Sequence, residues 1–323
     1  MIKKIFLAGM LGLTFLKAVV TLEPILSIEV NGTTKDMVVL NNELIVGTDK
    51  GLLQVYDYET QQFIKEIALP KVKDFMGDLV APRVFSVDKL EGKYLLLSDS
   101  GKGGYANLWI EKAGILTQLF NDTSKRAVIK ARFIDVNHVL LGLLSNEAVL
   151  FNVELKKELY RIQLNESKFS DFALNDDKSQ AVFACESGIL NIIDIKTGKI
   201  VKVLKGVNVD NVYKVDFKKN IIAGAGQDRR GSLYEVSLAQ GSYIEGSFLI
   251  YATGLSPSAK RVAFTMDEKN NISVYNRQTK EKIALLEGQK STLNTIVFKD
   301  ENILFSASDD SRVLMWNLKK KEK

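Results

Sequence analysis

The stretch "LFSASDDSRVLMWN" (304–317) decides the fold. An apolar run, an Asp-Asp turn and a second apolar run ending in Trp316 predict two antiparallel strands joined by a tight turn. The printed sequence stops at Lys323, a few charged residues later, so this pair has no following strand. The pair is therefore expected to belong to a larger sheet whose other strands lie elsewhere in the sequence.

The same pattern occurs six more times upstream. The copies are "LIVGTDKGLLQVYD" (44–57), "LLLSDSGKGGYANLWIE" (95–111), "LLGLLSNEAVLFNV" (140–153), "AVFACESGILNIID" (181–194), "IAGAGQDRRGSLYEV" (222–236) and "VAFTMDEKNNISVYN" (262–276). The key position near the end of the second strand, one or two residues before the closing polar residue, is occupied by Tyr56, Trp109, Phe151, Ile193, Tyr234, Tyr275 and Trp316. The successive spacings are 53, 42, 42, 41, 41 and 41 residues. A period near 41 is typical of a WD40-like β-propeller, here with seven blades.

Each copy is flanked by two further strand-like segments. Segments such as 169–174, 212–217 and 294–299 precede a pair, and segments such as 63–69, 158–164 and 199–205 follow one. The segments that follow alternate between apolar and polar residues, as expected of a strand with one buried face. The sequence therefore predicts an all-β protein with four strands in each blade.

The last unit lacks its fourth strand, and residues 25–30 ("ILSIEV") precede the first complete unit. Because a propeller removes exposed edges by closing its ring, we expect residues 25–30 to pair beside Trp316. Residues 25–318 then form a single domain. The WD signature is weak, with Gly288-Gln289 where such units usually carry Gly-His. We expect cohesion within blades to come from packing more than from hydrogen-bond relays.

The N-terminus resembles an export signal. Two lysines precede an apolar run from Ile5 to Leu16, which is short for a transmembrane helix. Residues 1–18 are predicted to be a signal peptide, or else a short uncleaved anchor, and only the anchor would give membrane contact. The lone Cys185 allows no internal disulfide, so the bacterial periplasm is the expected location. Residues 319–323 are predicted to form a solvated basic tail.

The charge balance argues against nucleic-acid binding. Of the net charge of +5, three charges come from lysines within residues 1–18, which contain no acid. A nucleic-acid-binding protein usually has a much stronger basic bias. We therefore expect protein partners instead.

No enzyme motif stands out. His138 is the only histidine and lies in an apolar run, so a nucleophile–base pair has little material from which to form. Cys185 is expected to be a small buried side chain. Asp176-Asp177 and Asp309-Asp310 fit tight turns, and residues 100–105 ("SGKGGY") lack the phosphate-loop spacing. The prediction is a non-catalytic protein without a cofactor or a metal.

The candidate site is a partner surface on one face of the ring. In a propeller, the turn between the second and third strands shares a face with the link to the next blade. The longest unit adds about eleven residues to this face, and long loops are often functional. The residues chosen as partner-surface candidates are Asp74, Phe75, Arg83, Lys102, Tyr105, Arg229 and Arg230.

Four Asn-x-Ser/Thr triplets also occur, at Asn31, Asn121, Asn165 and Asn271. Only Asn31 has an acid two residues before it, the feature that bacterial N-glycosylation prefers. From the sequence alone, chance occurrence is the preferred explanation of these triplets.

Several loop motifs resemble the NapL family, WD40-like proteins encoded with the periplasmic nitrate reductase of epsilonproteobacteria. The motifs are "LSDSGKGGY" (97–105), "KFSDFALN" (168–175), "CESG" (185–188), "VDNVYKVDF" (209–217), "AGQDRRG" (225–231), "SFLIYATGLSPS" (247–258) and "LFSASDDSRVLMWNL" (304–318). The resemblance covers most of residues 25–318. It implies an exported accessory protein that supports assembly or activity of the nitrate reductase system, and it supplies no catalytic residues.

Two other functions stay open from the sequence. The first is a propeller enzyme or small-molecule binder that uses the central channel, as lactonases or quinoproteins do, and it would need inward carboxylates with a metal. The second is an outer-membrane assembly propeller, although no lipobox cysteine follows the apolar run.

Overall fold

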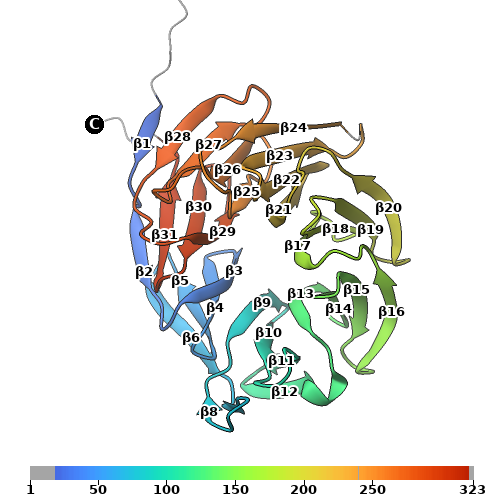
Figure 1. Cartoon of the computed structure of the whole chain (residues 1–323). Helices are drawn as coiled ribbons and strands as arrows, with labels where there is room; N and C mark the ends of the chain where they lie inside the picture. The colour runs from blue at the N-terminus through green and yellow to red at the C-terminus, as the bar shows by residue number, and fades with distance from the viewer. Residues whose placement is uncertain (1–18, 239, 320–323) are drawn as a thin grey trace, which may run out of the picture.

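The computed structural model describes residues 19–238 and 240–319. These residues form seven sheets arranged as blades around one axis (Figure 1). The predicted all-β, seven-bladed, WD40-like propeller is confirmed. Within the described residues, no helix has the length and apolar character needed to cross a membrane. The predicted signal (1–18) and most of the predicted tail (320–323) lie outside the described residues.

The blades follow the chain in order, and their strands have these bounds. Blade 1 is β3 (Thr34–Leu40), β4 (Glu43–Thr48), β5 (Leu52–Asp57) and β6 (Gln62–Ala68). Blade 2 is β9 (Val84–Leu90), β10 (Lys93–Asp99), β11 (Ala106–Lys112) and β12 (Ile115–Phe120). Blade 3 is β13 (Val128–Asp135), β14 (His138–Leu143), β15 (Glu147–Asn152) and β16 (Lys157–Gln163). Blade 4 is β17 (Phe169–Leu174), β18 (Gln180–Cys185), β19 (Leu190–Asp194) and β20 (Lys199–Leu204).

The remaining blades contain the two ends of the ring. Blade 5 is β21 (Val212–Lys218), β22 (Ile221–Gly226), β23 (Arg230–Glu235) and β24 (Gln240–Glu245). Blade 6 is β25 (Thr253–Leu255), β26 (Arg261–Thr265), β27 (Ile272–Asn276) and β28 (Lys282–Leu286), with β1 (Val20–Leu22) added outside. Blade 7 is β29 (Leu293–Phe298), β30 (Ile303–Ser308), β31 (Arg312–Asn317) and β2 (Leu26–Glu29). A short hairpin, β7 (Val72–Lys73) and β8 (Leu79–Val80), and one 3-10 turn, η1 (Asp122–Ser124), complete the described elements.

Burial follows the position of a strand within its blade. The middle strands are covered on both faces by neighbouring blades, and every residue of β5 is buried. The outer strand β16 alternates between exposed and half-buried residues along its whole length. This difference explains why the middle pairs read as continuous apolar runs while the outer strands alternate.

The core lies between blades as well as within them. Leu108 and Phe120 of blade 2 pack in one cluster with Phe133 and Phe151 of blade 3. Each such side chain contributes about 1.5–3 kcal/mol when it is fully buried. The ring is therefore stabilised by contacts that no single blade could make alone.

The first two described strands pair with blades 6 and 7. β2 pairs antiparallel with β31, with Leu26 opposite Met315 and Glu29 opposite Arg312. β1 pairs parallel with β28, with Leu22 opposite Leu286, so blade 6 has a fifth strand that the sequence pattern did not predict. Figure 1 shows both blue strands along the orange and red blades.

Blade 2 departs from the predicted repeat register. In six blades the key aromatic or apolar residue of the third strand pairs with a residue of the second strand. That second-strand residue pairs in turn with a residue at or near the C-terminal end of the innermost strand. In blade 1, for example, Tyr56 pairs with Leu44, and Leu44 pairs with Val39. In blade 2 the equivalent pairings join Glu111 to Tyr94 and Tyr94 to Lys89. The structural equivalent of Tyr56 is therefore Glu111 and not Trp109. Glu111 is buried and its charge is paired with Lys65 Nζ at 3.0 Å.

Blade 7 keeps a buried relay despite its weak signature. The indole Nε1 of Trp316 donates to Ser306 Oγ at 2.8 Å, and Gln289 Nε2 donates to the same oxygen at 2.6 Å. Ser308 Oγ in turn donates to Gln289 Oε1 at 3.0 Å. The weak signature did not predict this relay, which forms because a glutamine amide can both donate and accept as a histidine does.

Candidate functional site

The link between blades 1 and 2 carries the two most exposed large apolar side chains of the described residues, Phe75 and Met76. Phe75 is 92% exposed, Met76 75% and Leu79 62%. They lie on the β7–β8 hairpin, which projects from the ring in Figure 1. We call residues 70–83 the tip loop. Contiguous exposed apolar side chains on a soluble protein usually mark an interaction surface.

The tip loop is an ordered turn. Asp74 Oδ1 accepts hydrogen bonds from the backbone N–H groups of Met76 and Asp78, both at 2.9 Å. The backbone of Asp74 also bonds to Asp78, and Gly77 adopts a positive φ of 94°. The predicted partner residue Asp74 thus has a local role, which is to fix the turn that places Phe75 and Met76 in solvent.

A second turn supports the base of the tip loop. A Cβ atom at Gly101 would lie 2.2 Å from the carbonyl oxygen of Lys73, so the two backbones touch there. Gly101, Gly103 and Gly104 all have positive φ values, as expected for an extended hairpin turn. Arg83 Nε lies 2.9 Å from Asp99 Oδ2, which joins the end of the tip loop to the same turn.

Lys102 and Tyr105 lie on that supporting turn. The Lys102 side chain is 64% exposed and its Nζ lies 3.4 Å from Asp122 Oδ2. The Tyr105 ring lies against Gly103, where an added Cβ would approach it to 2.9 Å. The structure therefore brings five of the seven predicted residues into one neighbourhood: Asp74, Phe75, Arg83, Lys102 and Tyr105.

Arg229 and Arg230 lie elsewhere. They occupy the turn of blade 5, which is separated from blade 2 by two blades and by the ring axis (Figure 1). Arg229 is exposed, with a positive φ of 63°. Arg230 Nη1 donates to the Val207 carbonyl at 2.8 Å, and its guanidinium lies 4.8 Å from the centre of the Tyr243 ring. A partner that touches the tip loop and both arginines would have to span the ring.

The central channel is a second candidate site. It holds a cavity of about 550 Å³, lined by the innermost strands of the blades. Its charged lining residues are Asp36, Asp88, Lys89, Lys130, Arg132, Asp171, Lys178, Lys214, Asp216 and Lys218. The repeat pattern of the sequence does not predict this cluster. The signal that could have predicted the cluster is a pair of charged residues two positions apart inside an apolar strand, as with Lys130 and Arg132.

Ion pairs in the channel join blades. Arg132 lies 2.8 Å from Asp36 Oδ2, and Lys130 Nζ lies 2.6 Å from Asp171 Oδ1. Burial disfavours the charge of Asp36, but Arg132 followed by Lys130 outweighs it, so the pKa of Asp36 is lowered from 3.8. Burial is the main influence on Lys130 and lowers its pKa despite the opposing effect of Asp171.

The channel carboxylates also accept backbone N–H groups from the next blade. Asp36 accepts from Val87, Asp88 from Phe133, Asp171 from Val215 and Asp216 from Leu255, at 2.8–3.1 Å. These aspartates therefore bind one inner strand to the next. Burial raises the pKa of Asp88 from 3.8, with Arg132 opposing it.

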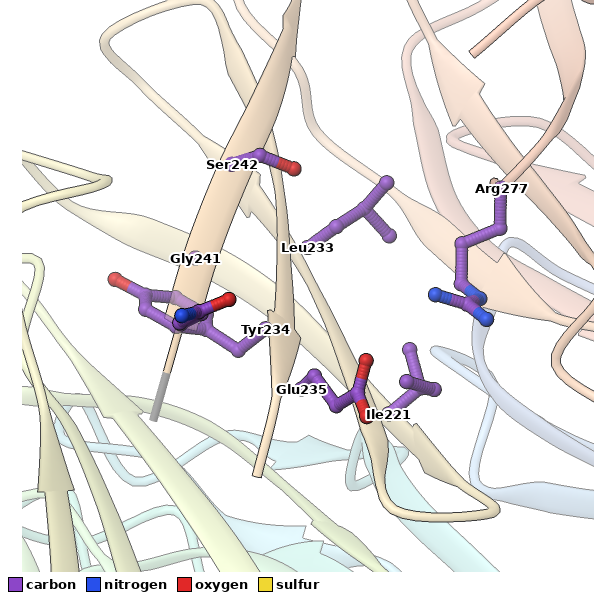
Figure 2. A pocket seen from close by; sticks show the side chains of 8 residues that line it. Ile221, Leu233, Tyr234, Glu235, Gly241, Ser242 and Arg277 are labelled. Carbon is purple, nitrogen blue, oxygen red and sulfur yellow. The ribbon is translucent and has the colours of Figure 1, made fainter. Parts of the chain in front are cut away.

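Figure 2 shows a smaller crevice of about 190 Å³ between blades 5 and 6. Glu235 and Arg277 extend into it, beside Leu233 and Ser242. Arg277 Nε donates to the Ala259 carbonyl at 2.9 Å, so its guanidinium is partly committed to the fold.

The residues considered for catalysis or metal binding have local partners. His138 is half-buried on β14 and its Nδ1 lies 2.8 Å from Asp135 Oδ2. Cys185 is fully buried, as expected. Asp177 and Asp310 accept backbone N–H groups two residues ahead, as turn residues do. Over residues 19–238 and 240–319, no group of three or more His, Cys, Asp or Glu side chains is placed to hold a metal ion.

Comparison with known proteins agrees with the fold. No family model and no curated protein matches the sequence. Among solved structures, a chain of "Crystal Structure of Mitotic Checkpoint Complex" superposes with a TM-score of 0.74 over 98% of both chains, at 13% identity. At that identity the similarity defines the fold alone. The chain therefore has the fold of a seven-bladed, WD40-like propeller.

Proposed function

We propose that this chain is a non-catalytic accessory protein of the periplasm. It binds protein partners through its loop face and supports the assembly or activity of a periplasmic nitrate reductase. The observation that carries the interaction role is the tip loop, where Phe75 and Met76 are 92% and 75% exposed on an ordered turn. Buried aromatic anchors dominate binding energy at many interfaces, and an ordered turn reduces the entropy lost on binding.

Two features of the sequence support the finer part of the proposal. The signal-like segment at residues 1–18 favours export. The resemblance of loops such as 97–105 and 225–231 to the NapL family connects the chain to nitrate reduction. The non-catalytic assignment rests on the lack of a recognisable nucleophile–base motif.

The exposed charges around the tip loop come in both signs. Arg83 and Lys102 are 65% and 64% exposed and are paired with Asp99 and Asp122. A rim of this kind contributes orientation and association rate more than affinity. We therefore assign affinity to Phe75 and Met76 and orientation to the surrounding charges.

The test is direct binding of purified chain to purified periplasmic nitrate reductase, measured by calorimetry. Phe75→Ser/Met76→Ser is expected to weaken binding at least tenfold, or about 1.4 kcal/mol. Its unfolding midpoint should not change, because both side chains are exposed in the free protein.

Arg229→Ala/Arg230→Ala is the matched control on the other side of the ring. If the wild type does not bind the reductase, the nitrate reductase assignment is wrong. If the tip-loop variant binds as tightly as the wild type while the arginine variant does not, the contact lies on blade 5. Photo-crosslinkers placed at residues 75 and 229 report the same distinction in periplasmic extract.

A further inference from the structure

The structure separates the four Asn-x-Ser/Thr triplets. Asn271 is buried, and its Nδ2 donates to Asp267 Oδ2 at 3.0 Å. Asn121 Oδ1 accepts from the backbone N–H and the hydroxyl of Thr123, at 3.1 and 2.6 Å. Asn165 Oδ1 accepts from the Ser167 N–H at 2.8 Å. These three side chains all serve local structure.

Asn31 differs from them. It is exposed on the link between β2 and β3, and its side-chain amide forms no hydrogen bond within the described part of the chain. The Thr33 hydroxyl, two residues later, also has no hydrogen-bond partner there. Exposure and side-chain freedom therefore select the same asparagine that the preceding acid selects in the sequence.

That acid is Glu29, which is exposed near the end of β2 and accepts a hydrogen bond from Ser311 Oγ at 2.8 Å. The residues at the corresponding position of the other triplets are Leu119, Gln163 and Lys269. Bacterial N-glycosylation prefers Asp or Glu at this position. Two independent criteria, one from sequence and one from structure, thus converge on one residue.

We propose that Asn31 is an N-glycosylation site of the bacterial type. The donor class is an oligosaccharide linked to a polyprenyl pyrophosphate. Asn31 Nδ2 forms a bond to the anomeric carbon of the sugar while the bond from that carbon to the pyrophosphate oxygen breaks. The polyprenyl pyrophosphate leaves, and the amide proton passes to a base of the transferase. The inference rests on the export that the proposed function includes.

The structure also indicates whether this reaction precedes or follows closure of the ring. In the closed ring, backbone hydrogen bonds hold the triplet and the residue before it in place. Val30, directly before Asn31, is 5% exposed, and its N–H donates to the Ser311 carbonyl at 2.8 Å. Asn31 N–H is bound to Gln54 Oε1 and Thr33 N–H to Asp49 Oδ1, both at 2.8 Å. A transferase that must bind this segment in an extended form competes with these contacts.

The partner of β2 is β31, the most C-terminal of the described strands. A chain exported from its N-terminus therefore exposes residues 29–33 before β31 reaches the periplasm. The other three triplets lie beside strands whose partners are near in sequence, and local pairing forms early. We infer that Asn31 is modified before the ring closes. Because its side chain faces solvent afterwards, a glycan there is compatible with the closed propeller.

The test uses the full chain behind a foreign export signal, so that the native signal is not being tested. The host carries a bacterial oligosaccharyltransferase and its lipid-linked oligosaccharide. Intact mass and peptide mapping of the periplasmic protein should show one glycan, at Asn31. Asn31→Gln should abolish it, and Glu29→Gln should reduce occupancy at least tenfold. Asn121→Gln is the matched control and should leave occupancy unchanged.

Exported protein without added mass overturns the site, and so does a glycan that survives Asn31→Gln. The timing has its own test with purified transferase. Unfolded chain in mild urea should be glycosylated at least tenfold faster than folded chain, with a short acceptor peptide as the control for enzyme activity in urea. Equal rates would overturn the order of events while leaving the site in place. Failure of the native signal to direct export would remove the proposed location without affecting either result.

Discussion

Arg132 of blade 3 forms a bidentate ion pair with Asp36 of blade 1, with Nη1 2.8 Å from Oδ2 and Nη2 3.0 Å from Oδ1. The pair passes over blade 2, where Arg132 also donates to Ser86 Oγ at 2.6 Å. Three consecutive blades are therefore joined by one side chain at the channel wall. The propeller is bound at its centre by charges and between its blades by apolar packing.

Breaking this pair is expected to be costly. Arg132→Met leaves the Asp36 carboxylate buried without its partner and should lower the free energy of unfolding by about 3–5 kcal/mol. The double variant Asp36→Leu/Arg132→Met should recover much of that loss, because it removes both buried charges. Urea unfolding of the single and double variants measures the coupling. Additive losses would mean that the two residues act independently.

Asp36 and Asp88 should show opposite pH dependence. The folded-state pKa of Asp36 is lowered by Arg132 and Lys130 against burial, so its contribution is present above the unfolded pKa of about 3.9 and is lost at lower pH. Burial raises the folded-state pKa of Asp88, so its contribution is present below about 3.9 and declines as pH rises. As the pH falls from about 6 to about 3, the loss of unfolding free energy caused by Asp36→Asn should therefore shrink. The loss caused by Asp88→Asn should grow over the same range. Denaturant unfolding at both pH values is the measurement, and parallel changes would contradict the assignment.

The relay in blade 7 predicts a graded series. Ser306→Ala removes the acceptor shared by Trp316 and Gln289 and should cost about 2–4 kcal/mol, because two buried donors lose their partner. Ser308→Ala removes one donor and should cost about 1 kcal/mol. Gln289→His should be close to neutral if histidine can take the same bonds. Thermal unfolding compares the three, and equal losses for both serines would rule out a shared acceptor.

The two N-terminal strands should contribute unequally. Ile28 on β2 is 2% exposed within the core that joins blades 7 and 1, so Ile28→Ala should cost about 2–5 kcal/mol. Thr21 on β1 is exposed, and Thr21→Ala should change stability by less than about 0.5 kcal/mol. Hydrogen exchange of β31 should rise in the Ile28 variant and not in the Thr21 variant. Unchanged exchange in both would show that β2 does not protect the last blade.

The support under the tip loop can be tested with two glycines of similar backbone. Gly101 and Gly104 have φ values of 76° and 71°, but an added Cβ meets the Lys73 carbonyl only at Gly101. Gly104→Ala should cost about 1–2 kcal/mol from its backbone alone. Gly101→Ala should cost more and should also weaken partner binding by displacing Phe75. Stability and binding measured together separate the two effects, and identical behaviour would mean that the contact does not position the tip loop.

Much of the fold could be predicted from local patterns. The recurrence of one strand pair predicted the seven blades, and the alternation of apolar and polar residues predicted the outer strands. The inner strand β17 (Phe169–Leu174) has its predicted bounds, and the bounds of the other predicted strands differ by one or two residues. Five of the seven candidate residues lie together because they share one link and the turn beneath it. Arg229 and Arg230 lie on the same kind of turn, but in blade 5, and the repeat alone does not show how far apart two such turns are in the ring.

By itself, the sequence determined the repeat, the strand type and the exposed tip loop, because these depend on residues close together in the chain. The tertiary structure alone decided the parallel docking of β1 on β28, the replacement of Trp109 by Glu111 in the repeat register, and the pairing of Arg132 with Asp36. Those contacts join residues that only the ring geometry brings together. The same geometry places Asn31 directly after β2, the partner of β31, so closing the ring limits access to the backbone around Asn31.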